Sequence, residues 1–309
     1  MELIQEQNVH NNKYMKVILS ILLAIPSFIF SQEYFLVNSL ESDFEVKKYT
    51  LDTKEIYNIR KDIDLYNVYV SKENILLLSV LPDLDEKILP RMDERGFNWK
   101  VIDYDKIKDK IFSKSEILNM VFNWKSDNTP DKKTLQYKLV KKENGSYYVS
   151  KLCLTEFFSI ADLKFPIIST YGTINISEPK VTIKQMEESF KKQIPDQDFI
   201  MDVRTGNYFR RLDNSYSFRN YLSKEFFIKE NKAYQFWTID GWWVIDGYNE
   251  HRGIDRFLYI PDKGIVGGSY DFYFRLKPKI SSNDYFTVSD YALWDNIINE
   301  KIMIAKELK

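Results

Sequence analysis

Residues 135–154 read LQYKLVKKENGSYYVSKLCL and give the clearest secondary-structure signal in the chain. Apolar and polar residues alternate on both sides of Asn144-Gly145, a pair that accepts the positive φ angles of a type I′ turn. A two-residue loop at this point pairs Lys141 with Tyr148. It also places a set of apolar side chains on one face: Tyr137, Leu139, Tyr148 and Leu152. The segment therefore predicts a β-hairpin with one buried face.

Strand signals also dominate the amino-terminal side of this hairpin. Short aromatic and β-branched runs, separated by polar turns, occupy residues 33–40, 44–52, 67–81 and 97–103. This pattern is typical of a strand meander. A lysine-rich stretch follows, and we expect a helix at 105–122 and a loop at 123–133. That loop divides the chain into two predicted regions, 32–122 and 134–309, which also suit a single domain.

Two helices are predicted in the carboxyl-terminal region. Thr182 and Gln185 fit a capping box, and Ile183, Met186 and Phe190 then recur at helical spacing. The second helix begins after Ser289, a suitable cap. Its apolar stripe would consist of Trp294, Ile297, Ile298, Ile302, Ala305 and Leu308. We therefore predict a strand-rich α+β fold of antiparallel hairpins and meanders with a few packing helices.

Residues 1–31 have the features of an export leader. The apolar run from Val17 to Phe30 follows positively charged residues and is shorter than the roughly 20 apolar residues of a membrane-spanning helix. Ser31 allows cleavage before Gln32, and Met15 is the expected true start. The leader resembles those of Gram-negative bacteria, which implies a bacterial protein exported to the periplasm or the extracellular space. We expect no stable membrane anchor in the mature chain.

The composition excludes several classes of function. The formal net charge is −1 with interspersed charges, so a nucleic-acid partner is not expected. Cys153 is the single cysteine and lies on a strand-like run, which favours a buried, inert thiol. One cysteine and one mature histidine, His251, are too few to build a zinc or other transition-metal site. We expect no transition-metal site and no cofactor. Calcium stays open as a ligand, because carboxylates are plentiful and backbone carbonyls can also bind it.

The chemically distinctive region spans residues 233–276 and begins AYQFWTIDGWWVIDGYNEHRG. Asp240-Gly241 predicts a hairpin turn that pairs Trp237 with Val244 and Gln235 with Asp246. Both faces of this hairpin are apolar, so it is either buried on both sides or presents an exposed aromatic platform. The platform would bind a ligand through Gln235, Trp237, Trp242 and Asp246.

A second hairpin is predicted around the turn at residues 261–264. Its return strand would alternate over residues 269–276, with Tyr270, Phe272, Phe274 and Leu276 facing inward. Gly267-Gly268 interrupts this strand and indicates a bulge or the close approach of another segment.

Ionisable residues gather between the two hairpins: Asp246, Glu250, His251, Arg252, Asp255 and Arg256. Ion pairs on a solvated loop account for such a cluster. If the loop instead faces the aromatic side, paired carboxylates and an imidazole would suit sugar hydrolysis. The candidate catalytic residues are then Asp246, Glu250 and His251, although no known catalytic motif surrounds them.

These observations predict an exported protein that binds a protein or glycan ligand through an aromatic hairpin surface rather than an enzyme. The alternative is a hydrolase of envelope polysaccharide or peptide that uses Asp246 or Glu250 with support from His251.

Overall fold

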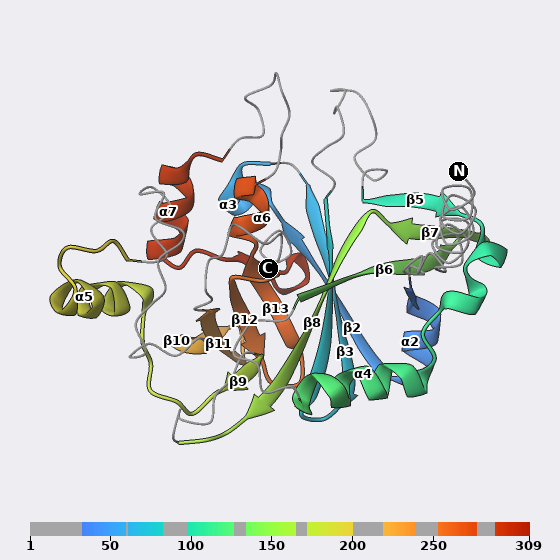
Figure 1. Cartoon of the computed structure of the whole chain (residues 1–309), viewed down its shortest axis with the longest axis horizontal. Coiled ribbons are helices and arrows are strands. Elements are labelled where there is room, and N and C mark those ends of the chain that lie inside the picture. Colours follow the sequence, from blue (N-terminus) through green and yellow to red (C-terminus); the bar gives the residue numbers. More distant parts are fainter. Residues whose placement is uncertain are drawn as a thin grey trace, which may run out of the picture. The chain divides into compact units, whose positions relative to one another are not determined.

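Two β-sheets and a set of short helices build the fold (Figure 1). The computed structural model describes residues 33–59, 61–82, 98–126, 134–164, 172–199, 219–238, 253–276 and 288–309. From Glu33 to Lys309 the chain forms one compact unit. The strand-rich α+β class predicted from the sequence is confirmed.

The first sheet has nine strands, with the order β2-β3-β4-β8-β6-β7-β5. Off this path, β1 runs parallel to β6 and β9 runs parallel to β8. The strands are β1 (Tyr34–Leu36), β2 (Glu45–Asp52), β3 (Asp62–Ser71), β4 (Asn74–Leu81), β5 (Trp99–Ile102), β6 (Thr134–Glu143), β7 (Ser146–Ser150), β8 (Leu152–Ala161) and β9 (Thr173–Asn175).

The second sheet has five strands in sequence order, each antiparallel to the next. They are β10 (Asn220–Ile228), β11 (Asn231–Thr238), β12 (Arg256–Ile260), β13 (Gly264–Ser269) and β14 (Met303–Ile304).

The described helices are short. They are α2 (Val37–Asp43), α3 (Lys54–Tyr57), α4 (Lys114–Ser126), α5 (Ile183–Gln193), α6 (Asp271–Leu276) and α7 (Asp290–Ile298), with 3-10 turns η2 (Tyr104–Lys106), η3 (Lys108–Lys110) and η8 (Lys306–Leu308). In the described part of the chain, no helix has both the length and the apolar character needed to cross a membrane. Figure 1 shows α5 and α7 beside the second sheet. Helix α2 lies against β1, β2 and β6 of the first sheet.

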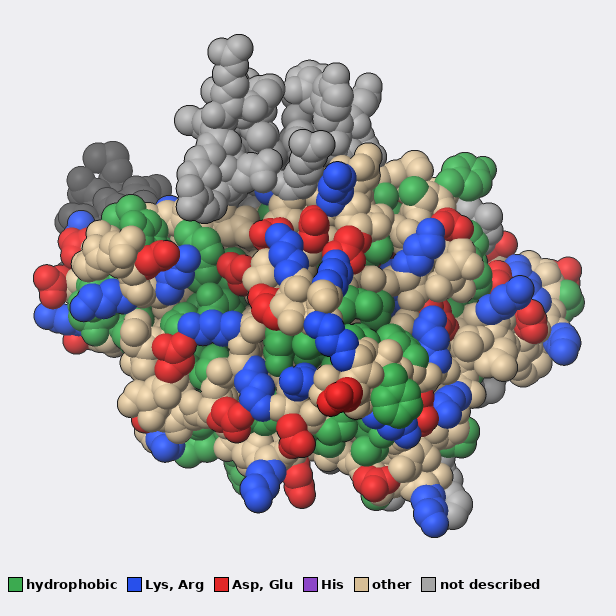
Figure 2. All heavy atoms as spheres, turned by 180° about the vertical axis from the view of Figure 1, so that it is seen from behind, with side chains coloured by type: hydrophobic (Ala, Val, Ile, Leu, Met, Phe, Trp, Pro, Cys, Tyr) green, Lys and Arg blue, Asp and Glu red, His purple; other side chains and the backbone are tan. Residues whose placement is uncertain are grey.

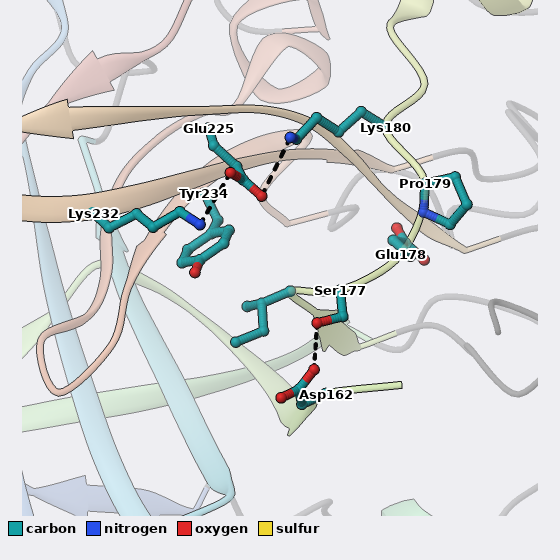
Figure 3. Close-up of a pocket in the computed structure, with 9 residues that line it drawn as sticks. Asp162, Ser177, Glu178, Pro179, Lys180, Glu225, Lys232 and Tyr234 are labelled. Atoms are coloured by element: carbon teal, nitrogen blue, oxygen red, sulfur yellow. Dashed lines mark hydrogen bonds and ion pairs between the residues drawn. The ribbon is translucent and has the colours of Figure 1, made fainter. Parts of the chain in front are cut away.

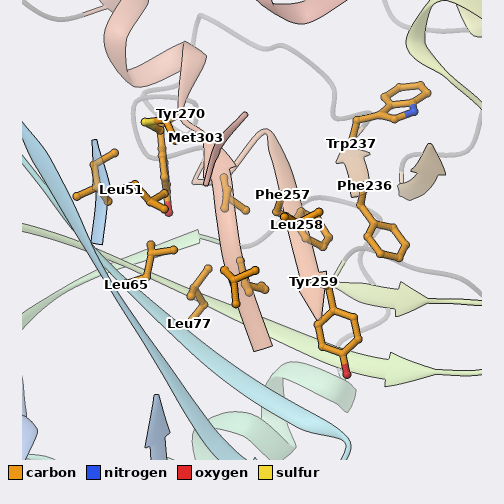
Figure 4. Close-up of a cluster of buried hydrophobic side chains, with 14 of the residues drawn as sticks. Leu51, Leu65, Leu77, Phe236, Trp237, Phe257, Leu258, Tyr259, Tyr270 and Met303 are labelled. Carbon is orange, nitrogen blue, oxygen red and sulfur yellow. The ribbon is translucent and has the colours of Figure 1, made fainter. Parts of the chain in front are cut away.

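The two sheets share a hydrophobic core (Figure 4). Leu51, Leu65 and Leu77 project from β2, β3 and β4 of the first sheet, and Phe257 and Leu258 come from β12 of the second; all are fully buried. Each such side chain contributes roughly 1.5–3 kcal/mol by its removal from water. The shared core explains why the sheets form one unit.

A second core lies on the opposite face of the first sheet. Leu76 and Leu78 alternate with Leu77 along β4 and pack with Leu40 of α2 and Ile117 of α4. The strand is therefore covered on both faces, which accounts for its almost continuous apolar sequence.

A buried polar side chain also joins the two sheets. The side-chain amide of Asn67 on β3 donates to the carbonyl of Ile265 on β13 at 2.9 Å and accepts from the Ile265 N–H at 2.7 Å. Asn67 is fully buried, so the N–H and the carbonyl of Ile265 are both hydrogen-bonded without water.

Several local predictions are confirmed. Asn144 and Gly145 have φ angles of 50° and 79°, and Lys141 pairs with Tyr148 in the β6–β7 hairpin. The capping box is also present, because the Thr182 Oγ1 accepts from the Gln185 N–H and the Gln185 Oε1 accepts from the Thr182 N–H. The hydroxyl of Ser289 caps α7.

Other predictions are wrong in the amino-terminal half. Residues 33–40 divide into β1 and α2, and residues 105–122 form 3-10 turns followed by α4, which extends to Ser126. Leu152 starts β8 and packs in the core between the sheets rather than with Leu139. Strands from both predicted regions pair in one sheet, because β4 lies beside β8.

In the carboxyl-terminal half, α7 ends at Ile298, and the predicted continuation to Leu308 is wrong. Met303–Ile304 instead form β14, which pairs with β13 at Gly267 and Gly268. The close approach predicted at these glycines is therefore present, and a register shift lies opposite them between Leu258 and Tyr259. The return strand is confirmed only to Ser269, because the next residues form α6.

Charged side chains are interspersed over the face shown in Figure 2. On the described part of that face, neither sign of charge forms a continuous patch.

Candidate functional site

The described residues of the predicted binding surface are buried. The Trp237 Nε1 donates to the carbonyl of Val181 at 2.7 Å, and its ring stacks on Tyr221 with centroids 4.8 Å apart. The Gln235 side chain donates to the carbonyl of Glu300 at 2.7 Å. Trp237 is 0% exposed and Gln235 is 2% exposed. Phe236 and Tyr234, on the opposite face of β11, are also buried. Of the two alternatives derived from the sequence, burial on both faces therefore holds for β11.

The predicted pairing of this hairpin is wrong for β11. One edge of β11 pairs with β10 and the other with β12, so Trp237 lies between Tyr221 and Arg256 rather than beside Val244. The remaining candidate site residues lie outside the described residues: Trp242, Asp246, Glu250 and His251.

Asp255 and Arg256 do not lie on a solvated loop, as the ionisable cluster had suggested. Both are buried, and the Arg256 guanidinium forms a two-point ion pair with Asp271. Arg256 also donates to the carbonyl of Lys301 from Nε at 3.0 Å and from Nη2 at 2.9 Å. The Tyr57 hydroxyl donates to Asp271 at 2.9 Å. This network joins α3, β12, α6 and the segment before β14.

Burial and charge set the protonation of this network. Burial acts to lower the pKa of Arg256, but the charge and hydrogen bonds of Asp271 outweigh it, so the pKa lies above its ordinary value. Burial, followed by the charge of Asp271, raises the pKa of Tyr57 well above its ordinary value. Tyr57 is therefore a protonated donor, and the buried network offers no group to solvent.

An open groove lies at the edge of the second sheet (Figure 3). Its volume is about 520 Å³, and it lies between residues 176–180 and the β10–β11 hairpin. Its lining includes Asp162, Ser177, Lys180, Glu225, Lys232 and Tyr234.

One wall of the groove presents two lysines held by one carboxylate. The Glu225 carboxylate lies 3.4 Å from the Lys180 Nζ and 3.0 Å from the Lys232 Nζ. Desolvation acts to raise the pKa of Glu225, but hydrogen bonds from Lys232 and Lys180 outweigh it, so the pKa is lowered. The hydrogen bond that Lys232 donates to Glu225 raises the pKa of Lys232. Glu225 and Lys232 are therefore charged at neutral pH.

Hydroxyl and carboxylate groups lie on the other side. The Ser177 hydroxyl donates to Asp162, which lies across the groove from Lys232 (Figure 3). The Tyr234 ring lies between the two sides, with its hydroxyl pointing away from Glu225 (Figure 3). The groove thus offers ammonium donors on one side and oxygen acceptors on the other.

Buried contacts hold the segment that carries Lys180. The Glu178 carboxylate binds the Arg219 guanidinium and accepts from the Leu222 N–H at 2.6 Å. The Val181 N–H donates to the carbonyl of Leu222 at 2.8 Å, and the Val181 carbonyl accepts from Trp237. Trp237 therefore acts in this site by positioning the groove wall, not by lining it.

The sequence pattern of this site is weak. Residues 224–237 read KEFFIKENKAYQFW, and pairing around Lys229 places Glu225 opposite Tyr234 and Phe227 opposite Lys232. The alternation of residues along 224–237 thus indicates a strand face that carries charged and aromatic side chains. Residues 162 and 176–180 lie far from this segment in the sequence and line the groove only because of the tertiary fold.

In the described ranges, no group of three or more His, Cys, Asp or Glu side chains is arranged to hold a metal ion. No protein-family model, curated protein or solved structure matches the chain.

Proposed function

We propose that this chain is an exported, non-enzymatic binding protein and that it holds a glycan in the groove on the β10–β11 hairpin. The observation that carries the proposal is the groove itself: an open volume of about 520 Å³ lined by charged and hydroxyl-bearing side chains. That size falls within the range of small-ligand sites, about 300–1,000 Å³.

The composition of the lining favours a sugar over a flat protein partner. Ammonium groups, carboxylates and hydroxyls can exchange hydrogen bonds with the many hydroxyl groups of a glycan. Phe227 lies two residues beyond Glu225 on the same face of β10 and is 69% exposed. An exposed aromatic ring beside a polar groove gives the apolar face of a sugar ring a surface to pack on.

The electrostatics of the groove favour binding over hydrolysis. A glycosidase needs a general acid whose pKa is raised, whereas the pKa of Glu225 is lowered by its lysine partners. Among the described residues, no observation favours the alternative hydrolase that would use Asp246 and Glu250.

Blocking the groove tests this function. We expect the mature protein to bind oligosaccharides on a glycan array and Ser177→Trp to abolish that binding, because the indole would fill the groove. Ser146→Trp is the matched control, since Ser146 is also exposed but begins β7 in the other sheet. Equal binding by both variants, each with an unchanged melting temperature, would place the ligand elsewhere.

The export part of the proposal has its own test. It is supported by the sequence alone, in which a short apolar run from Val17 to Phe30 follows positively charged residues. Mass spectrometry of the exported fraction should find an amino terminus near Gln32, from expression starting at either Met1 or Met15. An exported protein that retains Met1 or Met15 would contradict the leader assignment.

A further inference from the structure

We propose that the ligand of the groove carries a carboxylate, as in a uronic-acid glycan, and that the Lys180–Lys232 pair binds it. This inference rests on the proposed function and specifies its ligand class. It begins from an imbalance of charge: two ammonium groups share the single carboxylate of Glu225. The trio therefore has one surplus positive charge facing the groove.

Both lysines are accessible to a ligand. The side chains of Lys180 and Lys232 are 49% and 44% exposed, and both line the groove. Each ammonium group has three N–H donors, and its contact with Glu225 uses only part of that capacity. A second carboxylate can therefore bridge the same pair from the solvent side.

The buried carboxylate in the groove lining, that of Glu178, does not cancel the surplus charge. Glu178 is 4% exposed, and its charge is balanced by Arg219, with a further hydrogen bond from the Leu222 N–H. Asp162 lies on the other side of the groove, where it accepts from Ser177. A ligand with its carboxylate toward the lysines would place hydroxyl groups toward Asp162 and Ser177.

Glu225 limits the affinity of the lysine pair for an acidic ligand. Its carboxylate occupies part of the donor capacity that a ligand would use, so it competes with an incoming acid. A neutral sugar cannot replace these charge-assisted contacts, which are stronger than those between neutral groups. The lysine pair thus favours acidic ligands, and Glu225 limits their affinity.

The test compares sodium D-glucuronate with its methyl ester, which differ in charge but share the sugar ring. By calorimetric titration of the mature protein, we expect glucuronate to bind at least about fivefold more tightly than the ester, since two partly exposed ion pairs each contribute up to about 1 kcal/mol. Lys180→Gln and Lys232→Gln should each weaken glucuronate binding about fivefold and leave ester binding unchanged. Glu225→Gln should strengthen glucuronate binding about threefold.

Lys184→Gln is the matched control, because Lys184 is an exposed lysine on α5 that does not line the groove. This variant should bind both probes like the parent. Equal affinity for acid and ester, with both lost in Ser177→Trp, would overturn the carboxylate assignment and leave the glycan function standing. Binding of neither probe nor any array glycan would overturn both.

Discussion

Replacing Arg256 by Met should destabilise the protein far more than the loss of a surface ion pair would. The Arg256 and Asp271 side chains are 0% and 2% exposed, and burial already raises the pKa of Asp271 against the opposing effect of Arg256. Without Arg256, the Asp271 carboxyl group would remain buried and would lose its cation and two of its hydrogen bonds. Removal of one partner of a buried pair costs about 3–5 kcal/mol. The Lys301 carbonyl, which accepts from Arg256 at 3.0 Å and 2.9 Å, would also lose its donors.

The assay is urea unfolding of the mature chain, followed by tryptophan fluorescence. With a denaturant slope of about 3 kcal/mol per M, the unfolding midpoint of Arg256→Met should fall by at least about 1 M. Adding Asp271→Asn removes the orphaned carboxyl group, so the double variant should recover part of this loss.

Lys301→Met supplies the control. It breaks the exposed pair between Lys301 and Asp295, whose side chains are 48% and 57% exposed, and should cost at most about 1 kcal/mol. A loss below about 1 kcal/mol in Arg256→Met, equal to that control, would show that the Arg256–Asp271 pair is solvated and would refute the buried network.

Three further predictions concern the core and the backbone. Cys153 is fully buried, and burial raises its pKa to about 12, so a thiol reagent at pH 8 should label it only after unfolding; rapid labelling of the native protein would contradict this. Gly253 and Gly145 both have positive φ, but only at Gly253 would an added Cβ overlap another side chain, the Glu156 carboxylate at 2.3 Å. Gly253→Ala should therefore destabilise the protein more than Gly145→Ala does, by at least about 1 kcal/mol. Equal melting temperatures of the two variants would count against that packing. Burial raises the pKa of Asp64. The contribution of Asp64 to stability is therefore present at low pH and is lost as the pH rises through the pKa of the folded state. At neutral pH Asp64→Asn should have a higher melting temperature than the parent, and this difference should shrink on acidification.

Local signals predicted structure where neighbouring residues were sufficient to determine it. The turn at Asn144-Gly145 requires positive φ angles, and the Thr182–Gln185 box closes on itself, so both could be identified without knowledge of the tertiary fold. Cys153 was likewise correctly placed as a buried thiol, because its neighbours along the strand are apolar.

Secondary-structure prediction failed where contacts with distant segments buried residues that the alternation of polar and apolar side chains had placed at the surface. Tyr270, Phe272 and Phe274 alternate with polar residues as in a half-buried strand, yet Asp271 between them is 1% exposed because it pairs with Arg256. The segment is buried all round and forms a helix, so its alternation carried no information about a solvent face.

The carboxyl-terminal stripe failed for a related reason. After Ile298 the chain turns at Glu300, whose φ is 51°. The Glu300 carboxylate accepts from the Ile183 N–H at 2.6 Å, a partner more than a hundred residues away. Met303 and Ala305 are then buried beside β13 rather than along a helix.

The groove could not be predicted from the sequence because its walls come from separate parts of the chain. Lys180 and Lys232 are brought together by Glu225, by the Val181–Leu222 hydrogen bond and by Trp237. No short motif encodes this set. Trp237, which the sequence predicted as a ligand-binding residue, instead supports the groove wall through its hydrogen bond to the Val181 carbonyl.

The most direct measurement of the central claim is an amide chemical-shift titration of the isotopically labelled mature protein with D-glucuronate. If the groove on the β10–β11 hairpin is the ligand site, the largest saturable shifts should fall on Ser177, Lys180, Glu225, Lys232 and Tyr234, which line it. Saturable shifts concentrated on β5, β6 and β7, with the groove amides unchanged, would contradict the account.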